Sequence, residues 1–109
     1  MMDTRIFSYL ESRLDFAARR QQALSNNIAN LDTPGYKTQD VEFADELSGA
    51  TSTRAIEVEG KEKPNGNTVD LEAQMTELTK NGLQYVTLVQ YFNQKLKTLR
   101  TSISEGTRG

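Results

Sequence analysis

Apolar residues recur at helical spacing in two long stretches of the chain. Over residues 4–31 they step by three and four positions, which is typical of a helix that packs one face against another helix. The positions are Phe7, Leu10, Leu14, Ala17, Leu24, Ile28 and Leu31, with Gln21 in the remaining slot. The pattern predicts a helix over residues 4–31, on the order of 40 Å long.

The second stretch follows the same rule over residues 70–103 and predicts a helix about 50 Å long. Asp70 is the expected N-cap of this helix. Gly82 weakens a helix, so we expect another backbone to approach closely there. The stripe is formed by Leu71, Met75, Leu78, Gly82, Tyr85, Val89, Phe92, Leu96, Leu99 and Ile103.

Residues 32–69 have no such period and are polar and acidic. Pro34 and Gly35 predict a type II turn in which Gly35 has a positive φ, and Asn65-Gly66 indicates a second turn. Residues 53–59 alternate in polarity and could form an edge strand. Because the stretch has few apolar residues, we expect it to be a loop or to order only on assembly.

These elements predict a mainly α fold, in which two long heptad helices form a hairpin or a coiled-coil assembly element. The connecting segment is expected to be mostly irregular, with at most a short strand pair. We expect residues 1–109 to act as one unit: helix 4–31, turn and acidic loop 32–69, helix 70–103 and a flexible tail 104–109. A helix pair leaves apolar side residues in water and therefore favours association with copies or related chains. Those side residues are Tyr9, Leu83, Val86, Leu88 and Tyr91.

The composition excludes many kinds of catalytic and metal site. The 109 residues include no cysteine, histidine or tryptophan, which excludes disulfides, thiolate nucleophiles and the commonest metal ligand. Phosphate-binding glycine motifs are absent, and the loop lacks the ligand spacing of a calcium site. The paired carboxylates Asp45-Glu46 and Glu57 with Glu59 lie in a polar loop that would not desolvate them. We therefore expect no enzymatic activity, cofactor, metal or small-molecule substrate.

Charge is unevenly distributed around a formal net of -2, which is not the pattern of a nucleic-acid-binding protein. Residues 40–77 carry three bases and ten acids, whereas residues 78–109 carry five bases and one acid. A solvated loop is the simpler explanation of the acidic block, and charge complementarity between stacked copies is the alternative. No apolar run is long enough for a membrane span, and the N-terminus lacks the pattern of a cleaved signal peptide.

One window carries a specific resemblance. Residues 23–37 read ALSNNIANLDTPGYK, so that asparagines in the last helical turns precede a Thr-Pro-Gly-aromatic turn. This window resembles the signature of the bacterial flagellar rod and hook family. DVEF at residues 40–43 and GNTVDLE at residues 66–72, with NGLQY at 81–85, are similar to its proximal rod branch. The resemblance covers roughly residues 7–46 and 65–103.

The resemblance implies a structural subunit of the flagellar basal-body rod. Members of this family leave the cytoplasm unfolded through the flagellar type III apparatus, without signal cleavage. They assemble in the periplasm, with copies of themselves and other rod subunits, into a hollow shaft that transmits torque. The assembly seam would then be Leu10, Leu14, Leu24, Ile28, Leu31, Leu71, Met75, Leu78, Tyr85, Val89, Phe92, Leu96 and Leu99. The signature turn that holds the register between subunits would be Asn27, Asn30, Thr33, Pro34, Gly35 and Tyr36.

A different class of protein fits the helical pattern alone. A cytoplasmic helical-hairpin adaptor or chaperone would also contain two amphipathic helices joined by a polar loop. Such a protein is expected to be a stable monomer or a small closed oligomer, and not to depend on the Pro34-Gly35 turn.

Overall fold

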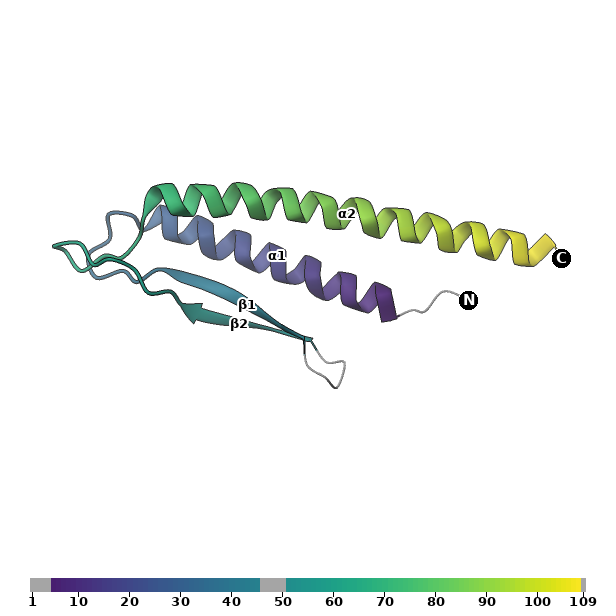
Figure 1. Ribbon diagram of the computed structural model, residues 1–109, viewed down its shortest axis with the longest axis horizontal. Coiled ribbons are helices and arrows are strands. Elements are labelled where there is room, and N and C mark those ends of the chain that lie inside the picture. The colour runs from purple at the N-terminus through teal and green to yellow at the C-terminus, as the bar shows by residue number, and fades with distance from the viewer. Residues whose placement is uncertain (1–4, 46–50, 109) are drawn as a thin grey trace.

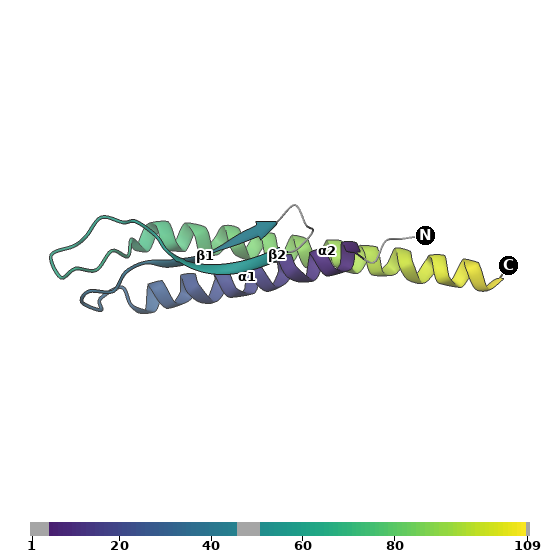
Figure 2. The ribbon, with the colours of Figure 1, turned by 90° about the horizontal axis from the view of Figure 1, so that it is seen from below.

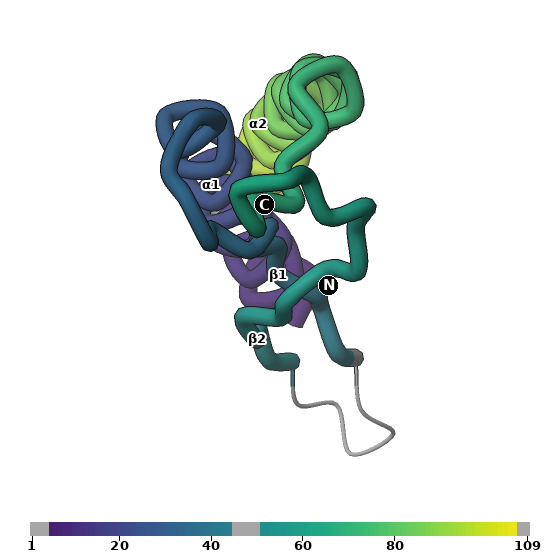
Figure 3. Tube along the Cα trace, turned by 90° about the vertical axis from the view of Figure 1, so that its left-hand side faces the viewer, coloured from purple at the N-terminus to yellow at the C-terminus, as the bar shows by residue number. Residues whose placement is uncertain are grey.

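The computed structural model describes residues 5–45 and 51–108 and contains four elements. They are α1 (Arg5–Ala29), β1 (Gln39–Asp45), β2 (Thr51–Glu57) and α2 (Leu71–Arg108). The molecule is a narrow rod of 71 × 28 × 14 Å, in which α1 and α2 run antiparallel (Figure 1). Seen from the end that holds the turns, the two helices lie side by side and the strands lie below α1 (Figure 3). The predicted mainly α hairpin is confirmed at this level.

Helix α1 follows the predicted period and packs its apolar stripe inward. Leu10, Ala17 and Leu24 are buried, with exposed fractions of 3%, 2% and 1%. The helix ends at Ala29, and the turn at Pro34 follows as expected. Gly35 has a φ of 75°, and the Tyr36 amide donates to the Thr33 carbonyl at 3.2 Å, which closes the predicted turn.

Helix α2 begins one residue after its predicted N-cap. The Ala73 amide donates to Oδ1 of Asp70 at 3.2 Å, which is the geometry of an N-cap. The helix continues to Arg108, beyond the predicted end at residue 103, so residues 104–108 extend it. Its C-terminal part runs past the N-terminal end of α1 (Figures 1 and 2).

The strands correct the expectation for the polar segment. β1 and β2 pair antiparallel from Gln39 opposite Glu57 to Asp45 opposite Thr51. The expectation of at most a short strand pair is confirmed, and sequence patterning indicated the strand near β2 but did not locate β1. The expectation that this stretch would be a loop, or would order only on assembly, is wrong for these two strands. Residues 46–50 lie outside the described residues.

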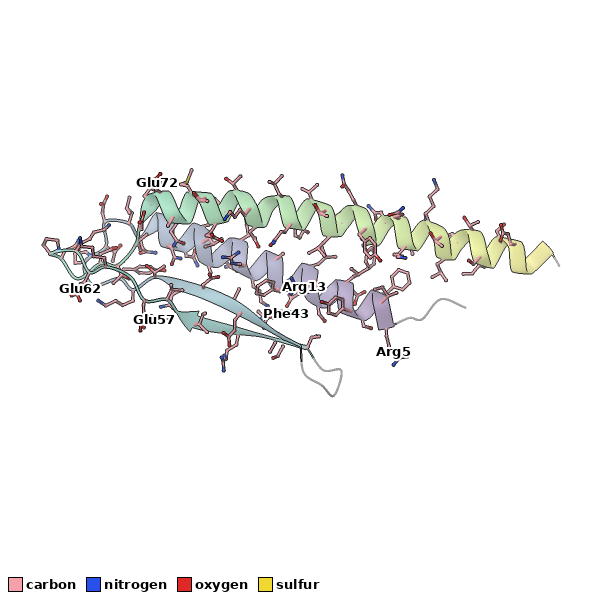
Figure 4. The ribbon with its side chains drawn as sticks, viewed as in Figure 1. Arg5, Arg13, Phe43, Glu57, Glu62 and Glu72 are labelled. Carbon is pink, nitrogen blue, oxygen red and sulfur yellow. The ribbon has the colours of Figure 1, made fainter. Side chains whose placement is uncertain are left out.

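An aromatic cluster holds the strand pair on α1. The ring of Phe43 in β1 lies 5.5 Å from that of Phe16 and 6.1 Å from that of Tyr9. The guanidinium of Arg13 stacks on the same ring at 4.4 Å, and Figure 4 shows Arg13 and Phe43 facing each other. Phe43 is thus a large apolar contact between the strand pair and α1.

Candidate functional site

The turn that follows α1 is fixed by the side chain of Asn27, which is fully buried. Its Nδ2 donates to the Gln39 carbonyl at 2.7 Å and to Oε1 of Gln74 at 2.8 Å. Its Oδ1 accepts from the Tyr36 hydroxyl and from the Gln39 amide, both at 3.0 Å. Both donors and both lone pairs of the amide are used. Asn27 thus joins α1, the turn, β1 and α2.

Asn67 performs the same task from the segment before α2 and is also fully buried. Its Nδ2 donates to the Asn30 carbonyl at 2.9 Å and to the Thr33 carbonyl at 2.8 Å. Its Oδ1 accepts from the Val69 amide at 2.7 Å. Both carbonyls lie in the turn after α1 and each also accepts a backbone amide, so Asn67 gives them a second hydrogen bond and ties this turn to the segment before α2.

The two turns also touch through their backbones. The Gly35 amide donates to the Asn65 carbonyl at 2.9 Å, and the Thr68 amide donates to the Tyr36 carbonyl at 3.0 Å. Gly66 has a φ of 82°, and a Cβ added there would lie 3.4 Å from the Cα of Gly35. Glycine at both turns therefore allows positive φ and close contact together. We name this region, residues 27–39 with residues 65–74, the turn junction.

A half-buried ion cluster lies beside the turn junction. Nε of Arg20 donates to Asp40 at 3.0 Å, and Nη2 donates to Glu77 at 2.8 Å, so that α1, β1 and α2 are joined. Burial disfavours the charged form of Arg20. Hydrogen bonds to the two carboxylates and their negative charges outweigh this, and the pKa of Arg20 is raised above its ordinary value. The stability that charged Arg20 contributes is fully present at pH values below the ordinary pKa of arginine, and it is lost only as the pH rises through the raised pKa. This contribution is therefore constant over the physiological pH range.

Further along the helix pair, Asn81 is fully buried at the α1–α2 contact. Its Nδ2 donates to the Ala17 carbonyl and to Oε1 of Gln21, both at 2.8 Å, whereas its Oδ1 has no hydrogen-bond partner. A hollow of about 320 Å³ lies here, lined in part by Ala18 and Gly82. A Cβ at Gly82 would meet nothing within 4 Å, so the expected close backbone approach is wrong within this chain.

The predicted seam residues fall into three groups. Leu10 and Leu24 are buried. Leu71, Met75 and Tyr85 are exposed, at 43%, 50% and 43%. The remaining residues are half-buried: Leu14, Ile28, Leu31, Leu78, Val89, Phe92, Leu96 and Leu99. Their predicted role between subunits stays a prediction.

The signature turn comes together in the structure as one stretch of the turn junction. Asn27 is buried, Asn30 and Tyr36 are half-buried, and Thr33, Pro34 and Gly35 are exposed. Its predicted role in register between subunits stays a prediction. Within the chain, these residues tie α1 to β1 and to the start of α2.

Sequence patterning missed the polar half of the helix contact. The apolar stripe predicted that Met75 and Gly82 would face α1. Gln74 and Asn81, each one residue earlier in the chain, are buried there instead. A signal was present, because Gln74, Asn81 and Leu88 recur every seven residues. Apolar periodicity does not reveal this recurrence, because two of the three side chains are amides. Arg20 carried no comparable sequence signal, and Asn67 was marked only as part of the GNTVDLE resemblance.

The turn junction is a structural joint rather than a reactive site. Its polar side chains hydrogen-bond to one another and to backbone groups, which holds the elements in place. Within the turn junction, no nucleophile lies beside a base that could activate it. In the described part of the chain, no group of three or more acidic residues is placed to hold a metal ion. Glu57 and Glu59 are exposed, as expected, while Asp45-Glu46 lie where no side chain is described.

Comparison with known proteins gives this joint its context. Residues 9–37, which include most of α1 and the signature turn, match the family described as flagella basal body rod protein. The chain is 33% identical to the flagellar basal body rod protein FlgB of Bacillus subtilis (strain 168), over 89% of this chain and 92% of that protein. The chain belongs to the FlgB family of flagellar basal body rod proteins. FlgB proteins of Escherichia coli (strain K12) and of Salmonella typhimurium are each 28% identical to it, over 90% of this chain and 92% of theirs.

Family membership confirms the resemblance read from the turn motif. FlgB proteins are structural components of the flagellar basal-body rod and are not enzymes, so this chain is a structural rod subunit. Such a subunit assembles with other components of the basal-body rod. Neither described helix has an apolar stretch that could cross a lipid bilayer.

Proposed function

We propose that this chain is a subunit of the proximal rod that assembles, through its two terminal helices, with copies of itself and with other rod subunits. The observation that carries this proposal is the uncovered apolar surface of α2. Large apolar side chains are exposed along nearly its whole length: Leu71, Met75, Leu83, Tyr85, Val86, Tyr91 and Ile103. Neighbouring subunits that covered them would complete a core that one helix pair leaves open.

The turn junction supports a role in transmitting torque. A drive shaft needs subunits that do not bend where their elements meet. Asn27 and Asn67 hold α1, β1 and α2 together through amides whose hydrogen bonds have fixed directions, and Arg20 adds a charged link between the same elements. We propose that the whole chain, residues 1–109, acts as one rod-type unit stiffened at this joint.

The remaining steps rest on family membership. We propose that the chain leaves the cytoplasm through the flagellar type III apparatus without a cleaved signal peptide, and that it meets the base of the basal body in the periplasm. Blocking that apparatus should retain the chain in the cytoplasm at its full length.

Deletion of the gene in its own bacterium tests the proposal. The deletion strain should not swim, and electron micrographs of its basal bodies should lack rods. The wild-type gene should restore both, and a Gln90→Asp variant should do the same, because Gln90 is exposed. Leu78→Asp and Phe92→Asp should not restore either, since each places a charge in the seam, where Phe92 contacts Phe7 with ring centroids 5.6 Å apart.

Two outcomes would overturn the proposal. One is a deletion strain that still builds rods. The other is normal swimming with Phe92→Asp when that variant is produced at the wild-type level. A soluble cytoplasmic chain bound to a single client, and absent from purified basal bodies, would support an adaptor or chaperone instead.

A further inference from the structure

We infer that Asn65 is a site of spontaneous deamidation, and that this modification opens the turn junction irreversibly. The chain contains two Asn-Gly pairs, Asn65-Gly66 and Asn81-Gly82. Asparagine before glycine is especially prone to deamidation, because no side chain on the glycine hinders its backbone nitrogen. The two pairs lie in opposite surroundings, so the fold decides which of them reacts. This inference goes beyond the rod function and does not depend on it.

The reaction needs only water. The backbone nitrogen of Gly66 attacks Cγ of Asn65, the bond from Cγ to Nδ2 breaks, and ammonia leaves with the proton of the attacking nitrogen. Water then opens the five-membered succinimide ring that results. Breaking the bond between the Gly66 nitrogen and Cγ gives aspartate. Breaking the bond between that nitrogen and the backbone carbonyl carbon gives isoaspartate, in which the main chain runs through Cβ and Cγ.

Asn65 lies where this reaction can occur in the folded chain. The segment between β2 and α2, which contains this exposed residue, lies at the end of the molecule away from both termini (Figure 1). The Gly66 amide donates to the Lys63 carbonyl at 2.8 Å, and Oδ1 of Asn65 accepts from the Asn67 amide at 3.1 Å. Both hydrogen bonds must break before the Gly66 nitrogen can reach Cγ. An exposed turn opens locally at a small free-energy cost, so the fold slows this reaction without preventing it.

Asn81 provides a matched contrast within the same chain. Its side chain is fully buried, and its Nδ2 donates to the Ala17 carbonyl and to Oε1 of Gln21, both at 2.8 Å. Gly82 lies inside α2, where its amide takes part in the helical hydrogen-bond pattern. Attack on Cγ would require α2 to unwind and to leave α1. This pair should therefore react only when the chain unfolds.

Isoaspartate at this position would break the contact between the two turns. The Asn65 carbonyl accepts from the Gly35 amide at 2.9 Å, and in isoaspartate it becomes part of a carboxylate beside the main chain. The main chain also becomes one carbon longer between residues 65 and 66. A Cβ on Gly66 would already lie 3.4 Å from the Cα of Gly35, so the junction has little room for that extra atom. The turn junction would therefore not close again.

Mass spectrometry of aged chain tests the site. The full-length chain is incubated in mildly alkaline buffer at a concentration that keeps it folded, and in parallel in urea. Tandem spectra locate the mass change from amide to acid, so both Asn-Gly pairs are followed in one sample. In the folded chain, Asn65 should react severalfold faster than Asn81. In urea the two rates should become similar, because the surroundings that distinguish the pairs are lost.

Two results of this experiment would overturn the inference. One is modification of Asn81 as fast as that of Asn65 in the folded chain. The other is a folded chain in which Asn65 stays intact while the chain in urea is modified.

The effect on the turn junction is tested on the separated products. Chromatography isolates the isoaspartate form, which labelling by an isoaspartyl methyltransferase identifies. Its urea midpoint should be lower than that of the unmodified chain, and its Gly35 amide should exchange faster. Asn65→Asp is the matched control, since it adds the same charge but keeps the backbone carbonyl, and its midpoint should stay near that of the wild type. Equal midpoints for the isoaspartate form and Asn65→Asp would contradict the opening of the junction.

A second variant shows whether Asn65 alone is responsible for the change on ageing. Asn65→Gln keeps an amide, but its longer side chain would have to form a six-membered ring, which forms more slowly. Its urea midpoint should therefore stay constant during an incubation that lowers the wild-type midpoint. An equal loss in Asn65→Gln would assign the change to another residue and would overturn the inference. None of these measurements uses rod assembly, so failure of the rod function would leave this inference intact.

Discussion

Asn27 is the residue on which the turn junction most depends. It makes four hydrogen bonds to three partner residues, and no other group in the described chain joins α1, the turn, β1 and α2 at once. A hydrogen bond within a folded protein contributes modestly, whereas a buried group that loses its partner costs about 1–3 kcal/mol. Asn27 therefore stabilises the fold mainly because its hydrogen bonds leave no buried polar partner unpaired.

Replacement of Asn27 should be far more costly than replacement of its neighbour. We expect Asn27→Ala to lower the free energy of unfolding by about 3 kcal/mol, because Gln39 and Gln74 lose buried partners. Asn26→Ala, at an exposed position in the same helix, should change it by less than about 0.5 kcal/mol. Urea unfolding followed by circular dichroism, at a protein concentration high enough to keep the chain folded, measures both. Equal effects of the two substitutions would contradict the role given to Asn27.

Gly82 gives a prediction of the opposite sign. A Cβ at this helical position meets open space within the chain, and alanine is favoured over glycine in a helix by about 1 kcal/mol. Gly82→Ala should therefore stabilise the isolated chain by up to about 1 kcal/mol in the same urea experiment. A destabilised variant would mean that a contact at Gly82 is absent from the described fold.

At the scale of elements, the strand pair depends on one aromatic side chain. Phe43 packs on Tyr9 and Phe16 and lies under Arg13, and it is the one aromatic residue in the two strands. A two-stranded hairpin is not stable alone in water, so its order must come from contact with α1.

Removing that ring should release the hairpin before it affects the helices. Phe43→Ala should lower the free energy of unfolding by about 2 kcal/mol and speed amide exchange in β1 and β2 more than in α2. Arg54→Ala is the matched control, since Arg54 is an exposed strand residue that pairs with Glu42, and it should cost less than about 0.5 kcal/mol. Unchanged exchange in the strands of the Phe43 variant would show that something else holds them.

At the scale of the whole molecule, the core is small for the length of the chain. Among the described side chains, the buried apolar ones are Leu10, Ala17, Leu24 and Val69. Much of the remaining burial is by amides, namely those of Asn27, Asn67, Gln74 and Asn81. A rod of this shape exposes much surface for the volume that it encloses, so association is expected to add a large part of its stability.

This leads to a concentration dependence. We expect the isolated chain to be partly unfolded or weakly associated at low micromolar concentration, and its thermal midpoint to rise with concentration. Thermal unfolding at several concentrations, together with analytical ultracentrifugation, measures this. A sharp cooperative transition whose midpoint is independent of concentration would show instead that the helix pair is a complete fold.

The amino-acid sequence by itself determined the two helices, the turn between α1 and β1, and the family. These depend on local information: apolar spacing, the Asp70 cap, and the proline and glycine that form the turn after α1. The bounds of α1 fell within two residues of those expected. The turn motif was specific because it combined several residue types in one short window.

Tertiary structure alone decided which polar side chains became interior. Asn27, Gln74 and Asn81 are buried because partners from distant parts of the chain satisfy their amides. The seven-residue spacing of Gln74 and Asn81 marks one face of a helix but does not identify these partners. β1 likewise forms because Phe43 finds α1 more than twenty residues away in sequence. The spacing of apolar residues can be seen in the sequence, whereas the hydrogen-bond partners of a buried polar group come together only when the chain folds.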